Sequence, residues 1–231
     1  MSTHQPDVID PTTRLARIAG AFYLAEILTH IPGVLIRGRL VSPENAALTT
    51  RNILTHASLL YSAFATDLVG FACYIVVTAL LYQLFKPVNR NVSATAAFFS
   101  LAGCTVGAFS CAFTIIPLFV LNGTAYSGAF PASELQALAL LFFRVYAACF
   151  NTSFVLFGFY CVLIGYLAFR SRFLPRTVGA LMVVAGIGWL TFIYPPAARH
   201  LTPAILIPGI IGEGSLTLWL LAGGRWQSVR S

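Results

Sequence analysis

Two residues that could do chemistry together lie near the start of the sequence, in its first long apolar stretch. Glu26 and His30 are four residues apart, so on a helix their side chains share one face, about 6 Å apart along the axis. A carboxylate beside an imidazole can relay protons or supply two ligands to a metal ion. A metal site needs three or four ligands, and the HExxH spacing is absent. We therefore predict neither a metal nor a cofactor, and satisfied polar packing and a proton or ligand site stay open.

A second pair, His56 and Asp67, lies in the next apolar stretch. Eleven residues separate them, nearly three helical turns, so both can face one stripe of a helix about 16 Å apart. If the first two spans run in opposite directions, Glu26 and Asp67 fall near the middle of the membrane, and His30 and His56 fall toward the outside. The pattern predicts a vertical polar stripe. Its alternatives are a hydrogen-bonded seam between helices and a path for a ligand.

The third acid within an apolar stretch, Glu213, is surrounded by helix-disrupting residues. It belongs to the segment Pro208-Gly209-Ile-Ile-Gly212-Glu213-Gly214. Proline and glycine can interrupt a helix, and interrupted helices line the binding sites of many transporters. The alternative is a simple kink, with Glu213 paired to a residue of another span.

Two further polar residues, Arg144 and Asn151, are seven residues apart and so share a helix face. Arg144 is expected near the outer membrane interface. There it can extend its charge toward water or pair with an acid, and the alternative is capture of an anionic ligand.

The composition requires that a membrane positions these residues. Of the 231 residues, 58% are hydrophobic and 9% are charged, whereas a soluble domain carries about 25% charged residues. The apolar residues form blocks near or above the roughly 20 residues that cross a bilayer as a helix. We predict an all-α integral membrane protein with about six transmembrane helices. The expected spans are 15–36, one within 52–85, 92–121, the later part of 134–169, 177–194 and 204–221. The blocks 52–85 and 134–169 exceed one crossing, and 37–51 is expected to be a loop.

Basic residues predict the orientation of these spans, because cytoplasmic loops are rich in Lys and Arg. With a cytoplasmic N-terminus, nine basic residues lie on the cytoplasmic side and four on the other. Both termini are therefore predicted to be cytoplasmic. The expected organisation is a polar tail over 1–13, a single six-span domain over 14–223 and a basic tail over 224–231. The net charge of +7 reflects this topology and not a nucleic-acid partner.

Small residues mark one face of the third expected span. Gly103 and Gly107 form a GxxxG pattern, which lets another helix approach closely. The pattern favours packing within the chain, and self-association into a homo-oligomer is the alternative. The five cysteines lie within apolar blocks without a CxxC pair and are interpreted as small core residues.

Several segments at the ends of the spans resemble a known family. They are Arg17-Ile-Ala-Gly20 followed by Tyr23-Leu24, the runs 81–90 and 165–176, and Gly212-Glu213 before 215–221. Across about residues 15–223 the chain resembles the bacterial membrane family of domain of unknown function 4386. The resemblance implies a multi-pass protein of the bacterial inner membrane. It implies no reaction, ligand or cofactor.

Three hypotheses for function follow from the sequence. The first is binding or transport of a small solute, a proton or a lipid-like molecule through a polar interior with Glu26, His30, Asp67 and Glu213 at its core. The second is a membrane-embedded enzyme that acts on a lipid or isoprenoid with a histidine and a carboxylate as acid and base. The third is a non-catalytic scaffold or regulatory subunit. Phosphate-binding loops and the GxSxG motif are absent, which lowers support for those enzyme classes.

Overall fold

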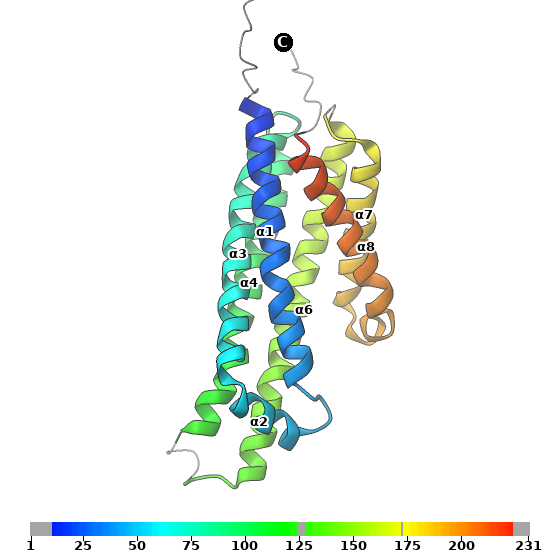
Figure 1. Cartoon of the computed structure of the whole chain (residues 1–231). Helices are drawn as coiled ribbons and strands as arrows, with labels where there is room; N and C mark the ends of the chain where they lie inside the picture. The colour runs from blue at the N-terminus through cyan, green and yellow to red at the C-terminus, as the bar shows by residue number, and fades with distance from the viewer. Residues whose placement is uncertain (1–10, 124–127, 172, 224–231) are drawn as a thin grey trace, which may run out of the picture.

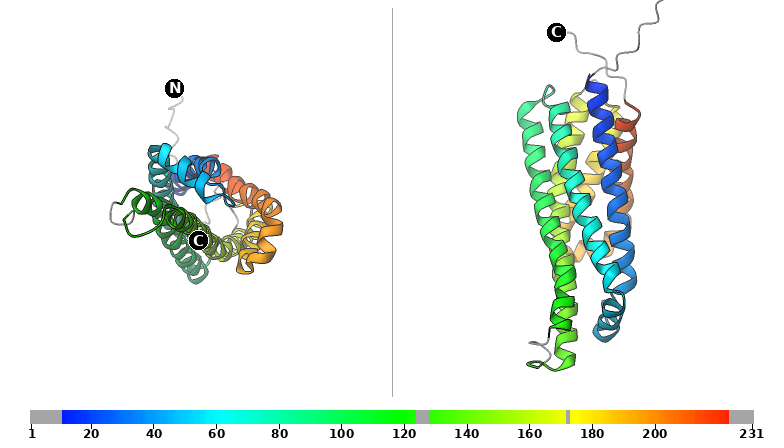
Figure 2. Two further views of the ribbon diagram at one scale, coloured as in Figure 1. Left: turned by 90° about the horizontal axis from the view of Figure 1, so that it is seen from below. Right: turned by 60° about the vertical axis from the view of Figure 1, so that its left-hand side comes forward.

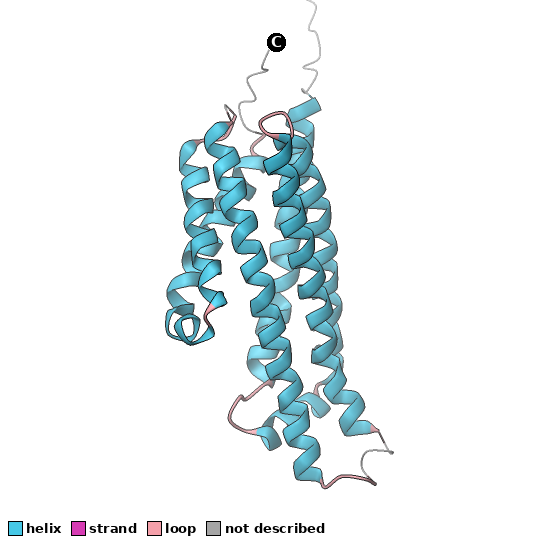
Figure 3. Cartoon of the chain, turned by 180° about the vertical axis from the view of Figure 1, so that it is seen from behind, coloured by secondary structure: helices cyan, strands magenta, loops and turns pink. Residues whose placement is uncertain are grey.

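A computed structural model describes residues 11–123, 128–171 and 173–223, and within these ranges the chain is helical with no strand (Figures 1 and 3). The elements are α1 (Pro11–Leu40), α2 (Ala46–Thr55), α3 (Ala57–Phe85), α4 (Arg90–Asn122), α6 (Ala132–Arg170), α7 (Arg176–Leu190), the 3₁₀ turn η1 (Thr191–Ile193) and α8 (Pro195–Leu221). Among the described residues, six helices are long and apolar enough to cross a membrane. The predicted all-α architecture with six spans is confirmed. Of the two predicted tails, 224–231 and most of 1–13 lie outside the described residues.

The helices form a bundle in which four long helices, α1, α3, α4 and α6, run side by side (Figures 1 and 2). The shorter helices α7 and α8 pack on one side of it, where α7 contacts α6 and α8 returns to α1. Large apolar side chains such as Phe98 and Ile210 are about 70% exposed on the outer surface, as expected for contact with lipid. The first residues of α1 and the last of α8 lie at the same end of the bundle (Figure 1).

Two helix boundaries on the first half of the chain differ from the prediction. α1 continues to Leu40, so Arg37 belongs to a helix and not to the expected loop over 37–51. The long block 52–85 is divided at His56, whose backbone leaves the helical region with φ −121° and ψ 37°. The short helix α2 thus precedes α3, and this break shortens the segment that has to cross the membrane.

The block 134–169, by contrast, belongs to one helix of 39 residues, which at 1.5 Å per residue is about 58 Å long and must extend beyond the hydrocarbon.

α8 contains the sixth predicted span and is longer than that span. The helix begins at Pro195, since proline is compatible with the first turn of a helix, and its part that can cross the membrane is Ala204–Leu221, as predicted. It then continues without interruption through the segment 208–214, and Glu213 accepts a hydrogen bond from Trp189 of another span, which agrees with the alternative in which Glu213 is paired and not with an interrupted helix. Two of the glycines in this segment, Gly209 and Gly212, provide room for side chains and backbone of α7. A Cβ atom at Gly212 would lie 2.8 Å from the backbone oxygen of Leu181 on α7.

Glycines also allow α6 and α7 to approach backbone to backbone. A Cβ atom at Gly186 would lie 2.7 Å from the carbonyl oxygen of Gly158, and one at Gly165 would lie 2.7 Å from the carbonyl oxygen of Gly179. These two pairs, seven residues apart on each helix, hold the α6–α7 hairpin together through close van der Waals packing.

The GxxxG face of α4 is used inside the chain. Gly103 and Gly107 are buried and lie against the rings of Phe157 on α6 and Phe71 on α3. A second copy of the chain could reach this face only if both rings moved. This arrangement agrees with packing within the chain, which is the interpretation that the sequence pattern favours.

Because α1 begins and α8 ends at the same end of the bundle, fusions to two positions can test the predicted orientation. Green fluorescent protein fused after residue 231 should fluoresce in cells, because it folds in the cytoplasm, whereas alkaline phosphatase fused after residue 130 should be active outside it. The opposite pattern of activities at these two positions would reverse the orientation.

The close α6–α7 contact predicts a cost for enlarging Gly165. The change Gly165→Val places a side chain against the α7 backbone and should lower the free energy of unfolding by about 1–3 kcal/mol. The matched control is Gly38→Val, since a Cβ atom at Gly38 meets nothing within 4 Å. Equal unfolding curves for the two variants in mixed dodecylmaltoside and dodecyl sulfate micelles would contradict this account.

Candidate functional site

A buried ion pair connects α1 and α3. The Arg37 guanidinium donates a hydrogen bond to the Asp67 carboxylate, and the two side chains are 9% and 0% exposed. Gly33, one turn before Arg37, gives the Asp67 carboxylate room to approach the α1 backbone. The Arg37 guanidinium also lies 4.8 Å from the centre of the Tyr146 ring on α6. Asp67 is thus neutralised by a base that was expected in a loop.

The other two membrane acids line a common cavity. Glu26 and His30 of α1 and Glu213 of α8 surround a cavity of about 170 Å³. Its remaining lining is mostly aromatic and comes from α3, α6 and α7, with one residue of α1: Val34, Phe71, Tyr74, Phe150, Ser153, Phe154, Phe157 and Trp189. Two carboxyl groups and an imidazole therefore face one small, ring-lined space within the bundle.

On α1, Glu26 and His30 contact each other. The Nδ1 atom of His30 lies 3.3 Å from Oε1 of Glu26 and 3.1 Å from the Glu26 carbonyl oxygen. The histidine ring packs edge-on against Phe71 with a centroid distance of 4.8 Å, and Gly70 provides the room for it. The second carboxylate oxygen of Glu26, Oε2, is buried without a hydrogen-bond partner. Buried polar atoms normally have a partner, and Oδ1 of Asp67 is a second buried carboxylate oxygen without one.

On α8, Glu213 is held by α7 and α6. The indole N–H of Trp189 donates a hydrogen bond of 3.2 Å to Oε1 of Glu213, and the Cys161 thiol lies 3.8 Å from the same oxygen. The Trp189 ring packs against Gly209 and stacks on Phe154 with ring centres 4.5 Å apart and planes within 7°. The indole therefore fixes where the carboxylate points.

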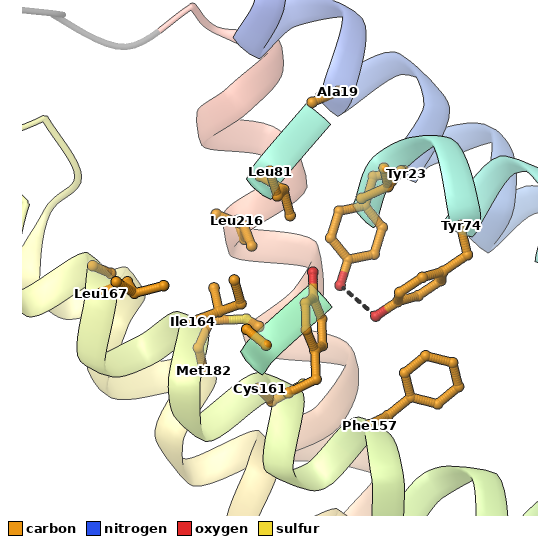
Figure 4. Close-up of a cluster of buried hydrophobic side chains, with 14 of the residues drawn as sticks. Ala19, Tyr23, Tyr74, Leu81, Phe157, Cys161, Ile164, Leu167, Met182 and Leu216 are labelled. Carbon is orange, nitrogen blue, oxygen red and sulfur yellow. Dashed lines mark hydrogen bonds between the residues drawn. The ribbon is translucent and has the colours of Figure 1, made fainter. Parts of the chain in front are cut away.

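A layer of tyrosines borders the cavity on the side of the chain ends. The hydroxyl groups of Tyr23 on α1 and Tyr74 on α3 are 3.2 Å apart and face each other, with Phe157 and Cys161 of α6 nearby (Figure 4). Tyr160 is 1% exposed, and its hydroxyl has no hydrogen-bond partner in the part of the chain that the structure describes. These phenols supply neutral donors and acceptors beside the carboxylates.

The structure brings together only some of the residues predicted from the sequence. Glu26, His30 and Glu213 line one cavity, and Asp67 belongs to the separate pair with Arg37. His56 is exposed at the α2–α3 junction, so it does not share a stripe with buried Asp67; the helix break at His56 invalidates the expected spacing.

Two other predicted residues, Arg144 and Asn151, also lie elsewhere. Arg144 is exposed and donates a 3.3 Å hydrogen bond to the Pro43 carbonyl, and half-buried Asn151 on α6 is not among the residues that line the cavity.

Two important residues of this region were missed. Arg37 could have been found from the spacing of Glu26, His30, Gly33 and Arg37, which recur every three or four residues and so mark one face of a helix. Trp189 carries no comparable signal, because its partner Glu213 is 24 residues away on another helix. In the described part of the chain, no three His, Cys, Asp or Glu side chains are grouped so as to hold a metal ion. The chemistry available is that of carboxylates, an imidazole, hydroxyls and an indole.

Comparison with models of known protein families assigns the chain to a family. The model of the family described as domain of unknown function (DUF4386) matches residues 18–224. The chain belongs to the DUF4386 family. This confirms the resemblance seen in the sequence, and the match covers every side chain that lines the cavity.

This DUF4386 protein is also similar to an uncharacterized protein of Archaeoglobus fulgidus. The two are 24% identical over 153 residues, which cover 65% of this chain and 76% of the archaeal protein. No solved structure gives a significant match.

The buried pair predicts a non-additive pattern of stability in the DUF4386 protein. The change Asp67→Leu leaves Arg37 buried without its partner and should lower the free energy of unfolding by about 3–5 kcal/mol. The double change Asp67→Leu with Arg37→Met should recover most of that loss, because no uncompensated charge remains. The matched control Arg39→Met removes an exposed arginine of the same helix and should have little effect. Additive losses in the double variant, measured by unfolding in mixed micelles, would contradict the pairing.

Proposed function

We propose that this DUF4386 protein binds a small molecule or a proton at the cavity around Glu26, His30 and Glu213 and passes it across the membrane. The supporting observation is that two carboxyl groups from opposite parts of the chain face the same cavity. Among the described residues, neither has an Arg or Lys partner within ion-pair distance.

The energetic argument rests on the contrast with Asp67. A charged side chain near the bilayer centre costs at least about 2.5 kcal/mol on insertion scales, so such residues are generally kept for a function or neutralised by a partner. Asp67 is neutralised by Arg37. Among the described residues, the Glu26 carboxylate has His30 as its one ion-pair partner, and Glu213 receives a hydrogen bond from a neutral indole. This arrangement supports an exchangeable partner, such as a proton or a ligand, at the two glutamates.

The position of the cavity also supports passage. Glu26 lies near the middle of α1, a helix that is long enough to cross the membrane. Carboxyl and imidazole groups at such depth are the usual components of proton relays in pumps and transporters.

A second candidate function is acid–base chemistry on a lipid or isoprenoid. It is favoured by the 3.3 Å contact between His30 and Glu26, which could act as a base and its orienting partner. Lipid extracts of a deletion strain would contain an accumulated precursor if the chain were such an enzyme, and an unchanged lipid profile would exclude this candidate.

Proton access to Glu213 can be followed through Trp189. In the variant Trp219→Phe with Trp226→Phe, Trp189 is the remaining tryptophan, and its indole donates to the Glu213 carboxylate. Protonation of Glu213 weakens that charge-assisted bond, so Trp189 emission should change with pH between about 4 and about 9. The further change Glu213→Gln should abolish the response, and Glu44→Gln, in the exposed loop after α1, should leave it intact. Emission that is constant with pH, or a response that persists in Glu213→Gln, would assign Glu213 a purely structural role.

A further inference from the structure

The glutamates of the cavity are also reached from the outer surface of the bundle. A groove of about 400 Å³ lies between α1 and α8. Four residues line both this groove and the inner cavity: Glu26, His30, Trp189 and Glu213. These side chains therefore form a shared wall between the outside of the bundle and its interior.

The groove exists because α1 and α8 contact each other at one end only. At the end where the described chain begins and finishes, Gly20 packs against α8, and a Cβ atom there would lie 2.7 Å from the backbone nitrogen of Leu221. Farther along, the two helices diverge, and α8 packs on α7 (Figures 1 and 2). The groove is bordered by apolar side chains that are exposed to lipid, Leu24 at 38%, Ile210 at 69% and Leu218 at 68%. It thus opens toward the hydrocarbon of the bilayer.

The chemistry of the shared wall selects for positive charge. Glu26 and Glu213 contribute two carboxyl groups, and even a protonated His30 would offset only one of them. The Arg37 guanidinium is already paired with the Asp67 carboxylate. Behind the carboxyl groups stand the rings of Trp189 and four phenylalanines, and aromatic faces attract cations, most strongly when water is excluded. A ligand that arrives through lipid must in addition carry apolar groups.

We propose that the site takes a lipophilic organic cation, an ammonium or phosphonium that carries apolar substituents, which enters from the bilayer through the groove between α1 and α8. This inference rests on the proposed function and names its substrate class. The apolar substituents contact the groove and the rings, and the cationic centre lies between Glu26 and Glu213. The unpartnered Oε2 atom of Glu26 is the acceptor that such a ligand would use.

Two probes of one shape and opposite charge test the substrate class. Tetraphenylphosphonium and tetraphenylborate are titrated into the full chain in detergent, with Trp189 emission as the signal in the variant Trp219→Phe with Trp226→Phe. We expect saturable binding of the phosphonium only, and a dissociation constant about tenfold or more higher after Glu213→Gln, because one of two facing carboxyl groups is lost. The control Glu44→Gln should bind as the parent does.

A substitution in the groove tests the route. Gly214 lines the groove but not the inner cavity, and a Cβ atom there meets nothing within 4 Å, so the side chain of Gly214→Phe would begin in open space at the groove and should obstruct it. In lipid vesicles this variant should associate with tetraphenylphosphonium about tenfold or more slowly, since the entry from lipid is closed. The control Gly38→Phe begins in open space as well, but it lies on α1 outside the groove lining and should keep the parent rate.

Each failure has a distinct meaning. Equal binding of both ions, with the same dependence on Glu213, would overturn the choice of cations and leave the proposed site in place. An unchanged rate in Gly214→Phe would overturn the lateral route. Absence of phosphonium binding, with Trp189 still responsive to pH, would overturn this inference alone. Absence of both binding and pH response would overturn the proposed function as well.

Discussion

The arrangement of this bundle depends on the free-energy cost of burying charge in a membrane. The Arg37–Asp67 ion pair lowers that cost for the buried Asp67 carboxylate. Because Asp67 is completely buried on α3, it requires a cation, and Arg37 of α1 provides it. The pair fixes how α1 is rotated against α3. Glu26 and His30 lie on the same face of α1 as Arg37, so the rotation that pairs Arg37 also directs these two side chains into the bundle. One ion pair thereby orients half of the candidate site.

Glycines provide the space in which these polar groups fit. The Asp67 carboxylate lies against Gly33, the His30 ring against Gly70 and the Trp189 ring against Gly209. In each case the glycine belongs to a different helix from the side chain that it accommodates, so the helices can approach while a large or charged group remains between them. The shape of the cavity is set by the backbone as much as by its lining side chains.

The sequence predicted the six spans and the family because apolar blocks of membrane length are a strong signal. It failed at Arg37, because a charged residue after a proline and a glycine is typical of a loop, and at His56, because a helix break inside an apolar block has no marker in composition. The i,i+4 spacing of Glu26 and His30 placed them together. Glu213 joins them only through the packing of α8 on α1, and no local pattern reports that contact.

The acidic residues within the membrane spans have two kinds of surroundings, and the difference between them bears on the function of Glu26 and Glu213. With Asp67, the chain neutralises a buried acid with an arginine, and the cavity of about 240 Å³ that Arg37 borders has no acidic side chain in its lining. With Glu26 and Glu213, it places two acids around a cavity and opens the same wall to lipid. If stability alone determined these positions, apolar residues or a second ion pair would serve better. The difference between the two treatments supports a site whose partner comes and goes.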